Sequence, residues 1–188
     1  MHPVNRASSR LLLRELTTDD VDAVFAVYGS PEATEHLSFE PRSVSEVRDI
    51  VSRSIASSRA VPRSEYALAV VRRDADEIIG ADEVIGFGRL ATDPHQPSGA
   101  TMGFALRPEV WRAGYGLETV RLLLGLAFDD LGLHRVWGAR SPANVASAVT
   151  MNRAGMVEEG RIREHVQKGG VWRDSVVHSI LEREWAAR

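Results

Sequence analysis

The short stretch from Arg107 to Gly116 constrains the fold of this chain more than any other. It joins an apolar, strand-like run, Met102–Leu106, to a long amphipathic helix that starts near Gly116. The first N–H groups of a helix have no partner within it, and the helix dipole adds about half a positive charge there. Gly114 and Gly116 leave those amides open to a bulky phosphate. The stretch predicts a pyrophosphate seat, although two glycines can also simply make a strand-to-helix turn.

The spacing disfavours two common phosphate sites. The turn is shorter than a Gly-x-x-x-x-Gly-Lys-Ser/Thr loop and lacks its lysine. It is also not Gly-x-Gly-x-x-Gly, because Thr119 stands at the third glycine position, which disfavours a dinucleotide fold. What remains is a ligand whose phosphates lie on backbone amides, with no metal-binding Ser or Thr required.

Composition narrows the class of protein. The chain has 188 residues, which suits one domain with a sizeable core, over residues 1–188. A net charge of −3 argues against a nucleic-acid partner. The absence of cysteine excludes a thiol nucleophile and a cysteine metal site. Without a signal peptide or an apolar run of transmembrane length, we expect a cytoplasmic protein with no membrane partner.

Apolar periodicity predicts a mixed α+β order with one βαβ crossover at its centre. It indicates seven strands, near residues 10–16, 66–71, 84–90, 100–106, 134–140, 157–166 and 171–181. It indicates four helices, near residues 17–28, 43–55, 116–131 and 144–153. Capping-box spacings mark the first two helix starts, at Thr17 with Asp20 and at Ser43 with Glu46. Arg72 to Asp82 is expected to be a solvated connection, with Ile78-Ile79 docked back.

The order of these elements and two motifs resemble the GNAT acetyltransferases, and most closely their ribosomal-protein N-terminal (Rim-type) branch. The motifs are Trp-x-x-Gly-Tyr-Gly-x-Glu, ending at Glu118, and Asn144-x-x-Ser147 followed by Gly155-Met156. The resemblance spans nearly the whole chain. It implies a GNAT fold, a mixed but mostly antiparallel twisted sheet that splays between the fourth and fifth strands.

The resemblance implies acetyl-CoA as the acetyl donor and no metal. The implied pyrophosphate-binding residues form the turn and the first turn of the helix; they are Trp111, Arg112, Ala113, Gly114, Tyr115, Gly116 and Leu117. Trp111 stands in the Gln/Arg slot of the motif. Arg112 replaces a frequent glycine, so its side chain either reaches a CoA phosphate or points to solvent.

Further cofactor contacts are implied along the fourth strand and the next helix. The backbone of Phe104, Ala105 and Leu106 is expected to pair with the pantetheine arm, with the Leu106 amide as the oxyanion donor. Plain core packing is the alternative for their side chains. Asn144 is expected to contact the cofactor arm and to cap its helix. Arg153 is expected near the adenosine end, or simply to favour the helix dipole.

The proton-transfer groups are less defined. Met151 replaces a frequent family tyrosine, so Ser147 is the candidate to protonate the leaving sulfur, unless it only packs the helix. Thr101 replaces a glutamate that often serves as base. The candidates for that role, acting directly or through water, are Glu40, His36, Asp93, His95 and His165, and no spacing selects one. An α-amino group with a pKa near 8 is already partly neutral at pH 7, so it needs no strong base.

The acceptor side leaves three functions open. Residues 30–63 and the late hairpin are expected to line an amine cleft. An acidic mouth is one interpretation of six glutamates, which are otherwise ordinary surface carboxylates; they are Glu32, Glu35, Glu40, Glu158, Glu159 and Glu164. We expect an N-acetyltransferase for a protein or peptide N-terminus, as a monomer or homodimer. A small-amine N-acetyltransferase and a non-catalytic acyl-CoA-binding module are the alternatives.

Overall fold

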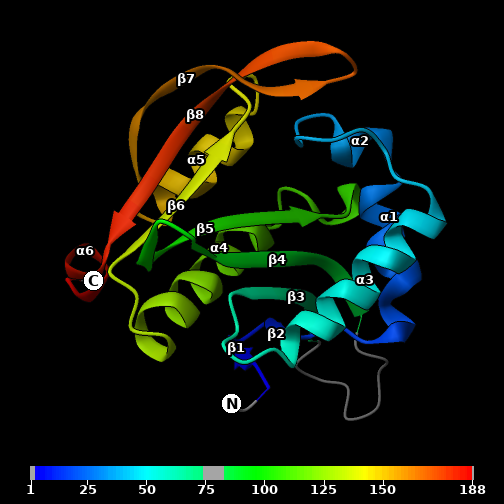
Figure 1. The fold of residues 1–188 in the computed structure, drawn as a ribbon, viewed down its shortest axis with the longest axis horizontal. Coiled ribbons are helices and arrows are strands. Elements are labelled where there is room, and N and C mark those ends of the chain that lie inside the picture. Colours follow the sequence, from blue (N-terminus) through cyan, green and yellow to red (C-terminus); the bar gives the residue numbers. More distant parts are fainter. Residues whose placement is uncertain (1–2, 74–82, 188) are drawn as a thin grey trace.

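The computed structural model describes residues 3–73 and 83–187, and these residues form one eight-stranded sheet. The strands lie in the order β1-β2-β3-β4-β5-β6-β8-β7 (Figure 1). They are β1 (Asn5–Ala7), β2 (Leu11–Glu15), β3 (Glu65–Arg72), β4 (Glu83–Asp93), β5 (Gln96–Leu106), β6 (Arg135–Arg140), β7 (Val157–Lys168) and β8 (Val171–Leu181). All neighbouring pairs are antiparallel except β5 and β6, which α4 connects in the expected crossover.

Helices cover both faces of the sheet, as the apolar run along β3 requires. Leu68 and Val70 pack in one cluster with α4 and α5, whereas Ala69 and Val71 pack in another with α1 and α3. Successive side chains of a strand point to opposite faces, so a strand buried on both sides is apolar throughout. The helices are α1 (Val21–Tyr28), α2 (Pro31–Thr34), α3 (Val44–Ser58), α4 (Tyr115–Gly125), α5 (Val145–Arg153) and α6 (Glu182–Ala186). None of the helices in the described ranges has the length and apolar character to cross a membrane.

The predicted α+β class is confirmed, with two differences in the elements. The sheet has eight strands instead of about seven, because the three-residue β1 pairs with β2. The described residues form six helices instead of about four, because α2 and α6 are short additions. Ser30 accepts a hydrogen bond from the Ala33 amide at 3.2 Å, so Ser30-Pro31 begins α2 rather than only ending α1. The predicted docking of Ile78-Ile79 lies outside the described residues.

β5 and β6 pair over only three residues before they part. Gly99 lies beside Arg135, Ala100 beside Val136 and Thr101 beside Trp137. Beyond Thr101, β5 continues to Leu106 along β4 alone. The predicted splay between these two strands is therefore confirmed, and one edge of β5 has no neighbouring strand there.

A glycine sits where the strands part. A Cβ added to Gly138 on β6 would lie 3.0 Å from the Met102 carbonyl oxygen of β5 and 3.5 Å from Cε of Met151. Both neighbours are in the packed interior, so the backbone of β6 approaches β5 closely here because no side chain intervenes.

We expect Gly138→Ala to lower the free energy of unfolding by about 1–3 kcal/mol, the usual cost of overpacking a filled interior. Urea unfolding with an unchanged m value would measure it. Gly103→Ala on β5 is the matched control, because an added Cβ there meets nothing within 4 Å. Equal losses in the two variants would contradict the close approach at Gly138.

Candidate functional site

The glycine turn leads from β5 through a short 3-10 turn, Pro108–Val110, into α4. Gly114 is the residue that caps α4, and its φ of +86° lies in the left-handed region that favours glycine. No side chain caps the helix, whose first turn closes with a 3.2 Å hydrogen bond from the Glu118 amide to the Gly114 carbonyl. The amides of residues 115–117 precede that bond and have no partner within the helix. The turn therefore offers N–H donors to an anion.

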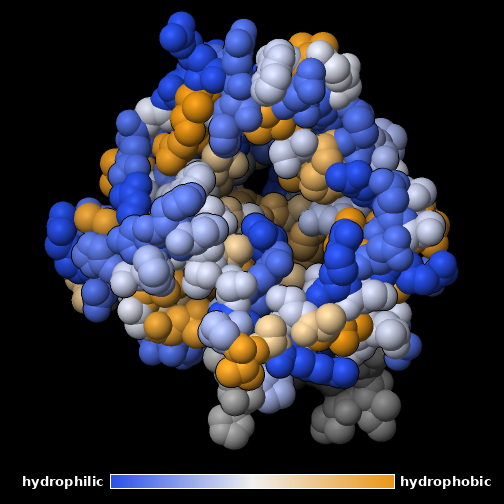
Figure 2. All heavy atoms as spheres, in the orientation of Figure 1, coloured by the Kyte–Doolittle hydropathy of each residue, from blue (hydrophilic) through white to orange (hydrophobic). Residues whose placement is uncertain are grey.

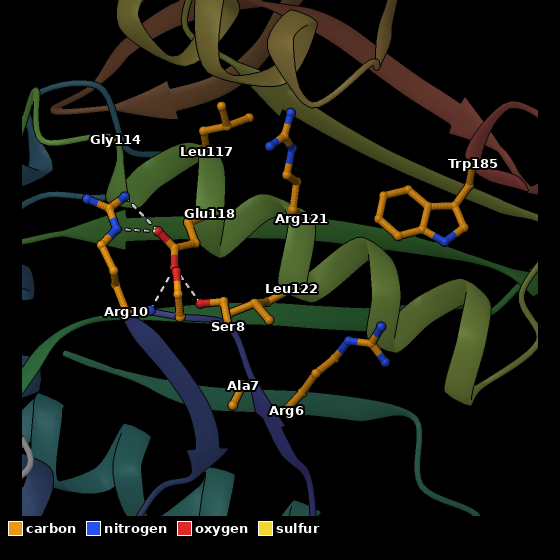
Figure 3. A pocket seen from close by; sticks show the side chains of 11 residues that line it. Arg6, Ala7, Ser8, Arg10, Gly114, Leu117, Glu118, Arg121, Leu122 and Trp185 are labelled. Atoms are coloured by element: carbon orange, nitrogen blue, oxygen red, sulfur yellow. Dashed lines mark hydrogen bonds and ion pairs between the residues drawn. The ribbon is translucent and has the colours of Figure 1, made fainter. Parts of the chain in front are cut away.

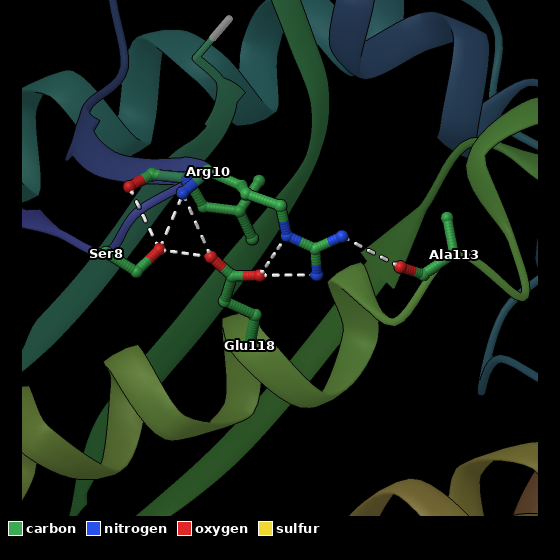
Figure 4. Close-up of polar contacts among 5 residues, drawn as sticks. Ser8, Arg10, Ala113 and Glu118 are labelled. Atoms are coloured by element: carbon green, nitrogen blue, oxygen red, sulfur yellow. Dashed lines mark hydrogen bonds and ion pairs between the residues drawn. The ribbon is translucent and has the colours of Figure 1, made fainter. Parts of the chain in front are cut away.

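Arg10, just before β2, holds this turn in place. Its Nε and Nη2 donate to the Glu118 carboxylate at 2.9 and 2.6 Å, and its Nη1 donates to the Ala113 carbonyl at 3.1 Å (Figure 4). The Ser8 hydroxyl also donates to Glu118. Burial acts to raise the pKa of Glu118, but the hydrogen bonds from Ser8 and Arg10 outweigh it and hold the pKa below its ordinary value. The ionised carboxylate thus ties α4 and the turn to the N-terminal strands.

The backbone of β5 alternates between its paired edge and its open edge. The Arg107 N–H donates to a carbonyl of β4 at 2.9 Å. The Ala105 carbonyl also faces β4, since a Cβ on Gly86 would lie 2.3 Å from it. Successive residues of a strand direct their backbone groups to opposite edges, so those of Phe104 and Leu106 face the opening.

Two contacts on the open edge agree with this alternation. The Trp111 indole Nε1 donates to the Leu106 carbonyl at 2.9 Å. Gly138 approaches the Met102 carbonyl from β6. The indole N–H of Trp111 therefore has a partner within the turn, while 43% of that residue stays exposed. The predicted backbone role suits Phe104 and Leu106 in orientation, whereas Ala105 directs its carbonyl to β4.

Strand β5 and helices α4 and α5, which carry the expected cofactor contacts, meet at Gly116. A Cβ added there would lie 3.6 Å from the Phe104 ring of β5 and 3.8 Å from Thr150 of α5. α5 begins at Asn144, whose Oδ1 accepts a 2.9 Å hydrogen bond from the Ser147 amide, so the predicted N-cap is confirmed. The Ser147 side chain is half-buried, and its hydroxyl makes no hydrogen bond within the described chain.

Other predicted positions lie at the rim or in the core. Arg112 is exposed, with an unusual φ of +63°, and Arg153 is exposed in the last turn of α5. Leu117 and Tyr115 are half-buried against the core, and the Arg10 guanidinium lies 4.6 Å from the centre of the Tyr115 ring. Met151, at the position of the family tyrosine, is only 3% exposed and belongs to the core.

A solvent-facing groove of about 620 Å³ runs along α4 and shares Gly114 and Leu117 with the turn (Figure 3). Two arginines that line the groove form ion pairs with nearby carboxylates. Arg6 pairs with Asp129 and Asp130, and Arg10 pairs with Glu118. The groove is not the opening between β5 and β6, whose residues do not line it.

A hollow near the middle of the molecule lies between β5 and the β7–β8 hairpin, with apolar atoms in its wall (Figure 2). The hairpin is fastened over it to the α2 region. Lys168 Nζ donates to the carbonyls of Thr34 and Glu35 at 2.6 and 2.9 Å. Arg173 donates to the Leu37 carbonyl at 3.2 Å. The late hairpin and the segment after α1 therefore meet, as expected for the two sides of one cleft.

The candidate bases are scattered. Asp93 and His95 lie at the tip of the β4–β5 hairpin, joined by a 2.9 Å hydrogen bond, and roughly 35 Å along the strand from Leu106. Thr101 is half-buried on β5, while Glu40 lies beside Gly169 of the hairpin. His36 is half-buried and His165 exposed. Burial raises the pKa of Tyr28, which packs edge-on against Phe39 and Phe87 and stays protonated.

Two of the six glutamates of the proposed acidic mouth form ion pairs with arginines of β6. Glu158 pairs with Arg140 at 3.2 Å, and Glu159 pairs with Arg135. Hydrogen bonds from Arg135 and Ser179 lower the pKa of Glu159. These two carboxylates are committed to neighbouring strands. No group of three His, Asp or Glu side chains able to hold a metal occurs in the ranges that the structure describes.

An opening in a sheet beside an uncapped helix start, with a capped helix opposite, offers backbone hydrogen-bond groups to an extended ligand that carries an anionic end. Residues 10–157 match the family model described as "Acetyltransferase (GNAT) domain". The chain therefore belongs to the GNAT acetyltransferases and is an N-acetyltransferase with the GNAT fold. This family uses acetyl-CoA.

Three relatives illustrate the range of the family. The Bacillus subtilis (strain 168) protein described as the uncharacterized N-acetyltransferase YoaA is 29% identical over 93% of this chain and 95% of its own. A putative ribosomal-protein-serine acetyltransferase from Vibrio cholerae has a TM-score of 0.75 at 21% identity, covering 94% of this chain and 97% of that one. The Vibrio cholerae spermidine N-acetyltransferase, in complex with CoA and spermine, has a TM-score of 0.79 at 20% identity, covering 95% and 99%.

We expect Gly114→Asp to weaken CoA binding by more than tenfold in calorimetric titration. The carboxylate would stand at the start of α4, where it would cap the open amides and repel phosphate. Gly132→Asp is the matched control, because Gly132 also has a positive φ, of +62°, at the far end of the same helical segment. Equal weakening in both variants would point to strain in the fold and remove the anion seat.

Proposed function

We propose that this N-acetyltransferase acts on the N-terminal amine of a protein or peptide. Binding of the acetyl donor is supported by one observation, the open edge of β5 beside the uncapped start of α4. Amides 115–117 would bind the diphosphate of acetyl-CoA, and the backbone of Phe104 and Leu106 would pair with the pantetheine arm. Asn144 would contact the same arm from α5, because Phe104, Gly116 and Thr150 bring the three elements together.

Acetyl-CoA supplies the acetyl group as a thioester. The Leu106 N–H, directed to the opening, would donate to the acetyl carbonyl oxygen as negative charge develops there. The Trp111 indole donates to the carbonyl of the same residue, in the next peptide unit, and so helps to hold the Leu106 backbone at this edge. The Ser147 hydroxyl, which no described residue engages, would donate a proton or a hydrogen bond to the departing sulfur.

The charges around the cleft favour an α-amine over a polycation. Glu158 and Glu159 are paired with arginines, and the described hairpin places Lys168 and Arg173 at the cleft. A cluster of free carboxylates is what would attract a polyamine. An α-amine also needs no strong base, since its pKa lies near 8. The Vibrio cholerae protein described as a putative ribosomal-protein-serine acetyltransferase has the same fold.

We expect turnover with acetyl-CoA and short peptides that begin with Ala or Ser, followed as release of free CoA. Spermidine is the matched competitor, because a spermidine N-acetyltransferase shares the fold. Turnover with spermidine and none with peptides would reject the peptide acceptor. CoA binding without turnover of any amine would favour the non-catalytic module.

We expect Ser147→Ala to lower kcat by about tenfold to a hundredfold, at the lower end of what a proton donor contributes. The KM for acetyl-CoA should change little, because the hydroxyl acts on the departing sulfur rather than on binding. Steady-state kinetics with a peptide acceptor would separate the two constants. Ser45→Ala, on the exposed surface of α3, is the control. An unchanged kcat would remove Ser147 from the mechanism.

A further inference from the structure

Arg140, the last residue of β6, donates hydrogen bonds from all three nitrogens of its guanidinium, and one of them bonds the segment that precedes α5. Its Nη1 donates to the Ser141 carbonyl at 3.1 Å and to the Pro142 carbonyl at 3.2 Å. Its Nη2 donates to Glu158 at 3.2 Å. The side chain is only 10% exposed. Few side chains other than arginine offer donors in three directions, so this position depends on the planar guanidinium.

A buried histidine fixes the direction of that guanidinium. Arg140 Nε donates to Nε2 of His178 on β8 at 3.0 Å, and His178 is 0% exposed. An arginine Nε always carries hydrogen, so Nε2 is the acceptor and neutral His178 carries its proton on Nδ1. That Nδ1–H is buried and unpaired within the described chain. Packing alone would favour an apolar residue here, so the value of the histidine lies in its acceptor.

The link to the site runs through one carbonyl. The Ser141 carbonyl that accepts from Arg140 also accepts from the Asn144 amide at 3.0 Å. Asn144 in turn caps α5 by accepting from the Ser147 amide. We propose that Arg140 and His178 are positioning residues that hold residues 141–147, and with them Asn144 and Ser147, in place for the acetyl-transfer site. The assignment of that turn to the cofactor rests on the function proposed above.

The arrangement requires His178 to be neutral. A proton on Nε2 would set an N–H against the Arg140 Nε–H and place two cations 3.0 Å apart. The charged groups that face the ring are Arg140 of β6 and Glu158 of β7, the latter 3.7 Å from Nε2. Burial, and then Arg140, lower the pKa of His178, and Glu158 offsets them only in part. The hydrogen bond from Arg140 to His178 is therefore present at neutral pH and is lost as the pH falls through the lowered pKa of His178.

Hydrogen exchange of residues 141–147 tests the proposal directly in the full chain. His178→Leu removes the acceptor, and exchange of these amides should accelerate about fivefold or more, as for the loss of one hydrogen bond. His178→Gln keeps an acceptor oxygen near the position of Nε2 and should restore exchange to within about twofold of wild type. His134→Leu, on an exposed histidine just before β6, is the matched control and should change nothing in this segment.

A pH series separates positioning from simple packing. At each pH from 8 to 5, the exchange rate of wild type is divided by that of His178→Gln, which cancels the intrinsic pH dependence. The ratio should rise as His178 protonates. A flat ratio, or equal protection in His178→Leu and wild type, would overturn the proposal. Faster exchange in His178→Leu with unchanged CoA affinity would establish that Arg140 and His178 hold this segment and would instead reject Asn144 as a contact of the cofactor arm.

Discussion

The unpaired edge of β5 is the constraint on which the rest of the structure depends. Backbone N–H and C=O groups inside a protein need partners, and an open strand edge inside a sheet is therefore unusual. Here three pairs join β5 to β6, and the strands then part beyond Thr101. Gly138 lets β6 come close to the Met102 carbonyl before it turns away, and Trp111 satisfies the Leu106 carbonyl. The edge is thus partly satisfied by the protein, and what remains suits an extended ligand.

The opening is kept in shape by contacts that are distant in sequence. Arg10 and Glu118 are 108 residues apart and tie the first strands to α4 beside the glycine turn. Lys168 and Thr34 are 134 residues apart and tie the late hairpin to the α2 region. Exposed ion pairs contribute little to stability on their own, but bidentate geometry makes an arginine–carboxylate pair directional. The effect of the Arg10 pair is therefore on the orientation of the turn more than on the free energy of unfolding.

Local patterns in the sequence predicted much of this fold. Apolar periodicity placed the seven longer strands and four main helices, and the Ser43–Glu46 capping box is formed as its spacing indicated. Ser30 and Pro31 begin α2, which at four residues is too short for apolar periodicity to reveal. The three residues of β1 carry too little periodicity to be recognised.

The residues of the candidate site also fall into those that local sequence reveals and those that it does not. The glycine turn and the Asn144 cap are local, so their positions in sequence were sufficient to find them. Arg10, Arg140 and His178 act across strands that are far apart in the chain, and no spacing within one segment reveals such partners. The pairing of Glu158 and Glu159, two members of the proposed acidic mouth, could not be predicted for the same reason, because their partners lie on β6. Sequence periodicity indicates which face a residue takes but not which neighbour meets it.

One physical theme connects the loops around the site. In each loop, an arginine or tryptophan side chain donates a hydrogen bond to a main-chain carbonyl. The pairs are Arg10 with Ala113, Arg140 with Ser141 and Pro142, Arg173 with Leu37, and Trp111 with Leu106. Carbonyls so occupied cannot repel an anionic or carbonyl-bearing ligand, whereas the amides of the same loops stay available. This division of donors and acceptors explains how a chain with a net charge of −3 can present a surface suited to a polyanionic donor. It depends on local backbone polarity rather than on net charge.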